Sequence, residues 1–149
     1  MKLRLHAIAG TLALLTISTF WISTVFSEIF GSHQTIAQVK TAVLYGMALL
    51  IPAMATAGAT GASLGRGWKL PQVAAKSRRM KIIAANGLLI LLPSAVFLAV
   101  KAQSGQFDGV FYAVQALELC AGAVNITLLS KNLRDGLALA RRRRARSAA

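Results

Sequence analysis

Residues 82–100 read IIAANGLLILLPSAVFLAV, a stretch without a single charged side chain. A helix needs about 20 mostly apolar residues to cross a hydrocarbon core about 30 Å thick. Three further stretches are comparably long and apolar, at about 5–27, 41–64 and 109–130. None of them alternates polar and apolar residues, as the strands of a membrane barrel do. The sequence therefore predicts an all-α membrane protein with four transmembrane helices.

The composition of the 149-residue chain agrees with this prediction. Its residues are 56% hydrophobic and only 14% charged, whereas about 25% of the residues of a typical soluble domain are charged. Such an apolar chain is not a disordered basic protein, and a single cysteine, Cys120, excludes a disulfide framework. The length fits one membrane domain over residues 1–149, and short connections favour an antiparallel up-down bundle.

The basic residues predict the orientation of the bundle. Of the 17 Lys and Arg residues, two precede the first stretch, six lie between the second and third, and seven follow the fourth. Only Lys40 and Lys101 fall on the other side. Because basic residues stay on the cytoplasmic side, we expect both termini in the cytoplasm of a bacterial-type cell with the chain in its inner membrane.

This orientation assigns each connection between the spans to one side of the membrane. Residues 28–40 and 103–108 are expected on the outer side, where Ser32 is placed to cap a helix leading into the second span. Residues 65–80 form the expected cytoplasmic loop, with Trp68 as an anchor at the membrane interface. The first apolar stretch is longer than the 7–15-residue core of a signal peptide, so we expect it to be a retained span.

The C-terminal tail, residues 131–149, is the most basic segment of the chain. It is expected to begin as a continuation of the fourth helix and to contact anionic lipid headgroups, at about 1 kcal/mol per basic residue close to the surface. Nucleic acid is the competing partner for a basic cluster, but topology already explains these charges, so no nucleic-acid partner is expected. The cluster consists of Arg141, Arg142, Arg143, Arg144 and Arg146.

Glu118 is the only Asp, Glu, Lys or Arg residue inside the four stretches, and it lies near the centre of the fourth. An ionised acid at the centre of a bilayer costs about 2.5–3.5 kcal/mol, so the protein must either protonate it or provide partners. Glu118 is therefore either a functional carboxyl group or a structural one that hydrogen-bonds to a neighbouring helix, and both interpretations remain open. Gln115 and Asn125 lie on the same helix stripe, and Gly122 between them leaves room for another backbone or a small ligand.

Two prolines are expected to kink the helices near the depth of Glu118. Pro52 and Pro93 each free the carbonyl group four residues earlier, which belongs to Ala48 or Leu89. A protonated Glu118 is able to donate a hydrogen bond to either carbonyl. Kinked helices around an acid are typical of a binding or gating site, and equally of any bent four-helix bundle.

Two patterns predict contacts between helices. Asn86 and Asn125 match in depth, which favours a hydrogen bond between the third and fourth spans, worth about 0.6–2 kcal/mol in membranes. Small residues recur every four positions in the second span, a spacing that allows close approach of another helix. We expect this partner to lie in the same chain. The small residues are Ala53, Ala57, Gly61 and Gly65.

The two histidines bear on haem and metal binding. His6 is at the start of the first span and His33 precedes the second, so the membrane separates them in a monomer. They are possible haem ligands only if a symmetric dimer pairs each histidine with its mate. No metal site is expected, and no catalytic motif such as His-Glu-x-x-His, a phosphate loop or a nucleophile elbow occurs.

Three functions remain open after this reading. The first is a small non-enzymatic protein that acts as an accessory or interaction subunit of a larger inner-membrane complex, or as a homo-oligomer. The second is proton-coupled transport or ion conduction, with Glu118 as the titrating group. The third is a redox module that binds haem or quinone, which is an analogy of architecture alone.

Overall fold

The computed structural model describes the backbone of residues 1–65 and 71–148 and the side chains of residues 1–65 and 73–141. Within these ranges the chain is helical and contains no strand. Four helices are long and apolar enough to cross a membrane, as predicted. In chain order the elements are α1 (Lys2–Phe30), α2 (His33–Gly65), α3 (Pro71–Asn86), the π-helix η1 (Gly87–Leu91), α4 (Leu92–Gln103) and α5 (Gly109–Ala148).

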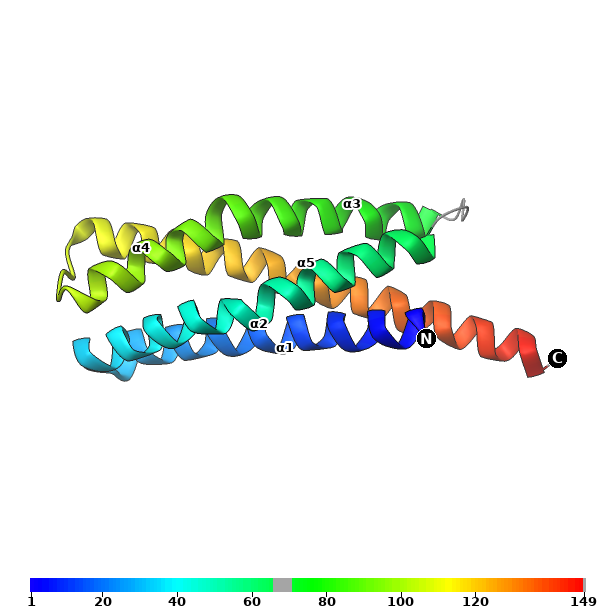
Figure 1. Ribbon diagram of the computed structural model, residues 1–149, viewed down its shortest axis with the longest axis horizontal. Helices are drawn as coiled ribbons and strands as arrows, with labels where there is room; N and C mark the ends of the chain where they lie inside the picture. Colours follow the sequence, from blue (N-terminus) through cyan, green and yellow to red (C-terminus); the bar gives the residue numbers. More distant parts are fainter. Residues whose placement is uncertain (66–70, 149) are drawn as a thin grey trace.

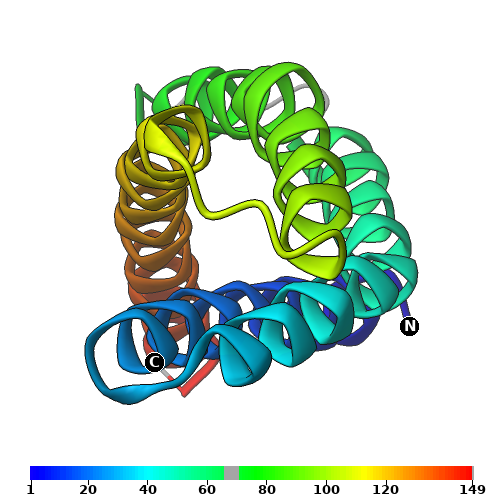
Figure 2. The same ribbon diagram turned by 90° about the vertical axis from the view of Figure 1, so that its left-hand side faces the viewer.

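The helices form an antiparallel up-down bundle (Figure 1). Since α3, η1 and α4 follow one another without a break, they make up the third of four long helical segments. Viewed along the bundle, α1 lies beside α2 and α5, and α4 lies beside the same two helices (Figure 2). Residues 31–32 and 104–108 lie at one end, named here the turn end. Both termini lie toward the other, named here the terminal end (Figure 1).

The helices extend further than the apolar stretches that predicted them. The connection expected over residues 28–40 is shorter than predicted, because α1 runs to Phe30 and α2 begins at His33, so that only Gly31 and Ser32 join the two helices. The expected loop over residues 65–80 is wrong, since α3 begins at Pro71, while Trp68 lies outside the described residues. Helix α5 continues into the tail as expected. Charged residues do not end these helices, because packing between helices supplies most of their stability.

The two helices that begin at the turn end, α2 and α5, are each capped by a side chain. Ser32 Oγ accepts a hydrogen bond from the backbone N–H of Thr35 at 3.2 Å, which is the cap that the sequence predicted for α2. The carboxylate of Asp108 accepts a bond from the N–H of Phe111 at 2.9 Å and so caps α5. Lys101 also donates to Asp108. These two hydrogen bonds hold the pKa of Asp108 below its usual range, and the bond from Lys101 has the larger effect.

The two prolines differ in their effect on the backbone. Pro93 lies at the start of α4, directly after η1, where the N–H of Leu92 bonds to the carbonyl of Gly87 five residues earlier. A proline has no N–H for the carbonyl four residues before it, and a widened π turn is one way for a helix to accommodate such a defect. Helix α2, in contrast, continues as an α-helix through Pro52.

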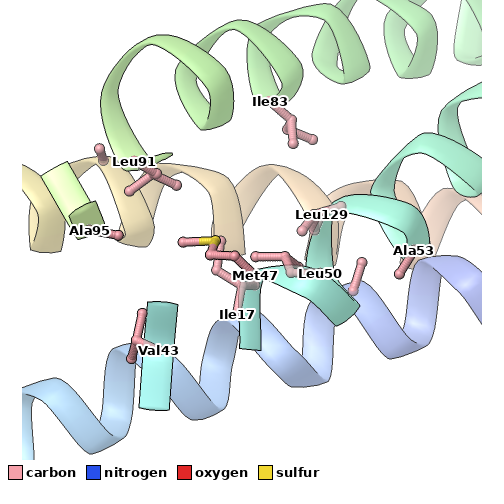
Figure 3. Close-up of a cluster of buried hydrophobic side chains, with 11 residues drawn as sticks. Ile17, Val43, Met47, Leu50, Ala53, Ile83, Leu91, Ala95 and Leu129 are labelled. Atoms are coloured by element: carbon pink, nitrogen blue, oxygen red, sulfur yellow. The ribbon is translucent and has the colours of Figure 1, made fainter. Parts of the chain in front are cut away.

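The main apolar core runs through the middle of the bundle, and side chains from all four long segments meet in it (Figure 3). Ile17 comes from α1, Met47 and Leu50 from α2, Leu91 from η1 and Leu129 from α5. A smaller cluster at the turn end is formed by Ile36, Leu98, Ala102 and Phe111.

Helices α1 and α2 are in tight contact where Gly46 faces Phe20. A Cβ atom built on Gly46 would lie 2.4 Å from Phe20 Cζ, well inside contact distance. Gly46 therefore leaves room for the end of the aromatic ring against the backbone of α2.

We predict that Gly46→Ala lowers the free energy of unfolding by about 1–3 kcal/mol, because the added methyl group forces the ring of Phe20 to move. The matched control is Gly10→Ala, since nothing lies within 4 Å of a Cβ atom at Gly10. There the higher helix propensity of alanine should leave stability unchanged or raise it by up to about 1 kcal/mol. Thermal unfolding in detergent, followed by circular dichroism, measures both. Equal effects of the two substitutions would contradict the close contact.

Candidate functional site

A buried ion pair lies between α2 and α5. The ammonium group of Lys40 donates to Glu118 Oε2 at 2.6 Å. The side chain of Lys40 is 0% exposed and that of Glu118 is 12% exposed. Because a buried charge is stable only when it is paired and hydrogen-bonded, each of these groups needs the other.

This pair corrects one expectation about Glu118. Its partner is an ammonium group and not a carbonyl group freed by Pro52 or Pro93. Within the bundle, Glu118 lies toward the turn end. Glu118 is the tenth residue of the 40-residue helix α5 and Lys40 the eighth of α2. At 1.5 Å per residue, both lie about 10–14 Å from the start of their helices, toward the turn end.

Two further acceptors lie near the pair. Gln115, one turn before Glu118 and 4% exposed, points its Nε2 toward Glu118 Oε2 at 3.5 Å, while its Oε1 is buried without a partner. Glu28, near the end of α1, is within electrostatic range of both Lys40 and Glu118. Its Oε1 is likewise buried without a hydrogen-bond partner. We name Glu28, Lys40, Gln115 and Glu118 the charged cluster.

A small pocket of about 40 Å³, partly open to the surface of the bundle, has Glu118 in its wall. The space beside Gly122, expected to admit another backbone or a ligand, is instead occupied by Trp21. A Cβ atom on Gly122 would lie 3.0 Å from Trp21 Cδ1. The indole Nε1 donates to the carbonyl of Leu119 at 2.9 Å and so fixes α1 against α5.

The hydrogen bond expected between Asn86 and Asn125 is present. Asn86 Nδ2 donates to Asn125 Oδ1 at 2.8 Å and lies 2.9 Å from the carbonyl oxygen of Ala121. Asn125 Nδ2 in turn donates to the carbonyl of Ile83 at 3.3 Å. These bonds join α3 to α5 where the α-helix passes into η1. The four polar residues proposed from sequence therefore form two separate groups, with Gln115 and Glu118 in one and the two asparagines in the other.

The stripe of small residues on α2 faces elements of the same chain, as expected. Ala53 and Ala57 are buried. A Cβ atom on Gly61 would lie 3.0 Å from the ring of His6, and one on Gly65 would lie 3.1 Å from Val73. The stripe thus accommodates α1 and the start of α3.

His6 links three helices toward the terminal end. Its Nδ1 lies 3.0 Å from the carbonyl oxygen of Ala57 and 3.1 Å from Thr60 Oγ1. A carbonyl only accepts, so Nδ1 carries the hydrogen and Nε2 is left to accept from Lys76 Nζ at 3.2 Å. Both ring nitrogens are therefore occupied inside the bundle. His33 lies at the turn end, where its ring stacks on Phe107 at 4.1 Å between centroids.

A second ion pair lies toward the terminal end. Arg79 Nη1 donates to Asp135 Oδ2 at 2.6 Å and to Asn132 Oδ1 at 3.1 Å, which joins α3 to α5. Both charged side chains are partly exposed, at 25% and 32%. Arg141 is exposed, while the side chains of the remaining predicted headgroup residues, Arg142, Arg143, Arg144 and Arg146, lie outside the described ones.

The other hollow of note is on the surface. It measures about 460 Å³ and is open, and its described lining comes from α2 alone, so it encloses no site. In the part of the chain that the structure describes, no group of three or more His, Cys, Asp or Glu side chains is arranged to hold a metal ion.

Comparison with known proteins gives no relative to guide the assignment. No protein-family model matches the chain, and neither curated proteins nor solved structures show significant similarity to it. The site must therefore be interpreted from its own residues.

Sequence reasoning missed Lys40 and Glu28, because both were assigned to a connection. For Lys40, the helical spacing of its neighbours indicates that the side chain is buried. It lies four residues after Ile36 and three before Val43, both of which are buried, so it falls on the buried face once α2 begins at His33.

We predict that Lys40→Met lowers the free energy of unfolding by up to about 3–5 kcal/mol, because it leaves a buried carboxylate unpaired. The double variant Lys40→Met/Glu118→Gln should recover most of this loss, since it removes both charges. Thermal unfolding of the single and double variants in detergent measures the coupling. Lys101→Met/Asp108→Asn serves as the exposed-pair control and should cost about 1 kcal/mol or less. Additive losses at Lys40 and Glu118 would contradict the ion pair.

Proposed function

We propose that this chain is a four-span protein of a bacterial-type inner membrane with both termini in the cytoplasm. Its four apolar helices support membrane insertion, and both termini lie toward the same end of the bundle (Figure 1). The helix ends nearest that end carry most of the basic residues, which is the side that the positive-inside rule assigns to the cytoplasm. The turn end then faces outward.

We further propose that the protein is non-enzymatic and acts as a subunit, either in a larger membrane complex or with copies of itself. The observation that carries this proposal is the closed interior. Trp21, Lys40 and Asn86 each bond to α5, and the pocket of about 40 Å³ beside Glu118 is far smaller than the roughly 300–1,000 Å³ of a small-molecule site. A filled bundle acts through its outer surface, which here meets lipid and other membrane chains.

The basic end of α5 supports an additional lipid contact. The helix continues to Ala148, and Arg141 is exposed. With the termini in the cytoplasm, this arginine-rich segment lies beside the anionic leaflet, where each basic residue near the surface contributes about 1 kcal/mol.

Purification in a mild detergent tests the subunit function. We expect the tagged chain to elute with other membrane proteins, or at a multiple of its own 15.7 kDa, as measured by native mass spectrometry. An absorption spectrum of the same material is expected to lack a Soret band, and a stoichiometric band would instead favour the haem module. A single chain without any partner, in detergents that preserve known complexes of the same membrane, would contradict the proposal.

Proton-linked transport is a second candidate, and the Lys40–Glu118 pair is the observation that favours it. Ionisable residues inside membrane helices are rare and frequently belong to proton or ion pathways. Here an acid and a base lie 2.6 Å apart, and the acid lines a small, partly open pocket. Transfer of a proton to Glu118 would release Lys40, and so loosen the contact between α2 and α5.

For this candidate we predict that Glu118→Gln reduces proton flux into liposomes at least about tenfold, because the amide cannot take up a proton. Flux is measured with a pH-sensitive dye after reconstitution of the full chain. Asp108→Asn is the matched control, since Asp108 is an acid at the same end that lies outside the bundle interior, and it should retain full flux. Undiminished flux in Glu118→Gln, or no flux in the wild type, would rule out transport through Glu118.

A further inference from the structure

Helix α2 differs from the other long helical segments in having no exposed charge. Its only Lys, Arg, Asp or Glu residue is Lys40, whose side chain is buried in the bundle. The other segments all expose basic residues, among them Lys2 of α1, Arg78 of α3 and Arg134 of α5. In a chain with a net charge of +13, the outward side of α2 is therefore a neutral surface.

A series of residues recurs along this outward side at alternating steps of four and three positions, and we name it the outer α2 face. Its half near the turn end is polar. The surface hollow of about 460 Å³ lies on this half, and because its described lining comes from α2 alone, a helix seated in it would pack against the outside of the bundle. The polar half consists of Gln34, Gln38, Tyr45, which are exposed, and Thr41, which is half-buried.

The other half of the outer α2 face is small. It consists of Ala48, Pro52, Ala55, Ala59 and Ala62, all of them exposed.

The neighbouring helix α1 is different at the same depths. Ala48 and Ala55 lie 15 and 22 residues from the start of α2, and Leu15 and Ile8 lie equally far from the end of α1 at the turn end. Both of these α1 residues are large, apolar and exposed, as suits contact with lipid tails. Small residues are typical of surfaces where membrane helices contact one another, and a seven-residue repeat is the spacing of left-handed helix pairs. The outer α2 face therefore has the composition and spacing of a helix contact.

We propose that the outer α2 face is the contact surface between two copies of this chain, whose α2 helices run parallel about a two-fold axis along the membrane normal. This inference rests on the proposed membrane insertion and self-association, and it names the surface that the association uses. Copies of one chain insert with the same orientation, so this axis brings each residue of the face to the depth of the same residue in the partner.

Three properties of the face fit a second copy in particular. Each polar side chain in it has both a donor and an acceptor, so it is able to bond to the same residue of the partner. The face is uncharged, so two chains of net charge +13 meet without the like-charge contact that the exposed basic residues of α1, α3 or α5 would bring. The small half, from Ala48 to Ala62, lets the two backbones approach closely along about 21 Å of helix.

Cysteine cross-linking in native membranes tests this surface. Cys120 is the only cysteine of the chain and is first replaced by Cys120→Ser. In that background, mild oxidation of Ala48→Cys and Ala55→Cys should give disulfide-linked dimers at twice the 15.7 kDa of the chain. The matched controls, Leu15→Cys and Ile8→Cys, lie at the same depths on α1. They should give at least about tenfold less dimer, because a disulfide needs Cα atoms within about 7 Å.

Leucine substitutions test the same contact without a cross-link. Ala55→Leu and Ala59→Leu each add a large side chain where the two backbones meet, and should weaken dimerisation about tenfold or more. Ala84→Leu makes the same change on the exposed side of α3 and should leave the dimer fraction unchanged. Native mass spectrometry over a series of protein concentrations measures all three variants. Since each of these positions is exposed in the single chain, the added side chain leaves the bundle core intact.

The outcomes separate this surface from the proposed subunit function. Absence of cross-links at Ala48 and Ala55, equal cross-linking at the two α1 positions, or cross-links only to a different protein would each overturn the homodimer surface. A chain that associates with other membrane proteins, or with itself through another face, keeps the subunit function and loses this surface. A chain that stays single contradicts both.

Discussion

Two turns of α5 bond to every other long segment of the bundle. Leu119 accepts from Trp21 of α1, Glu118 from Lys40 of α2, and Asn125 from Asn86 of α3. Apolar packing favours contact but does not specify direction, so a bundle of apolar helices has several ways to slide or rotate. Each of these polar bonds is satisfied at one register only, and a shift of one helical turn, about 5.4 Å, would break it.

This constraint explains why the small residues lie where they do. Gly122 is within the same two turns of α5 and leaves space for the indole of Trp21, whose Nε1 reaches the backbone beside it. In the same way, Gly46 on α2 leaves space for the ring of Phe20. Close backbone approach and polar bonding thus occur together, because a side chain of ordinary length reaches a partner only when the two helices are close.

The parts of this structure that follow from one-dimensional periodicity could be predicted from the sequence. Hydropathy gives four helices, and matched depth gives the bond between Asn86 and Asn125. The charged cluster could not be found this way, because hydropathy treats a charge as the end of a span, which excluded Lys40 and Glu28 from the helices that contain them. Nothing in the sequence pairs Trp21 with Gly122 either, since that contact depends on how the helices rotate about their axes.

The arrangement of the helices also determines what stabilises the Lys40–Glu118 pair. At the turn end α2 and α5 begin while α1 and α4 end, so two partial positive and two partial negative helix termini lie side by side. Helix dipoles that alternate in this way largely cancel, and their effect is confined to the last turn in any case. Lys40 and Glu118 lie about two turns or more inside their helices. The Lys40–Glu118 pair therefore depends on its own ammonium and carboxylate groups and not on the helix termini, and removing either charge leaves the other one buried without its partner.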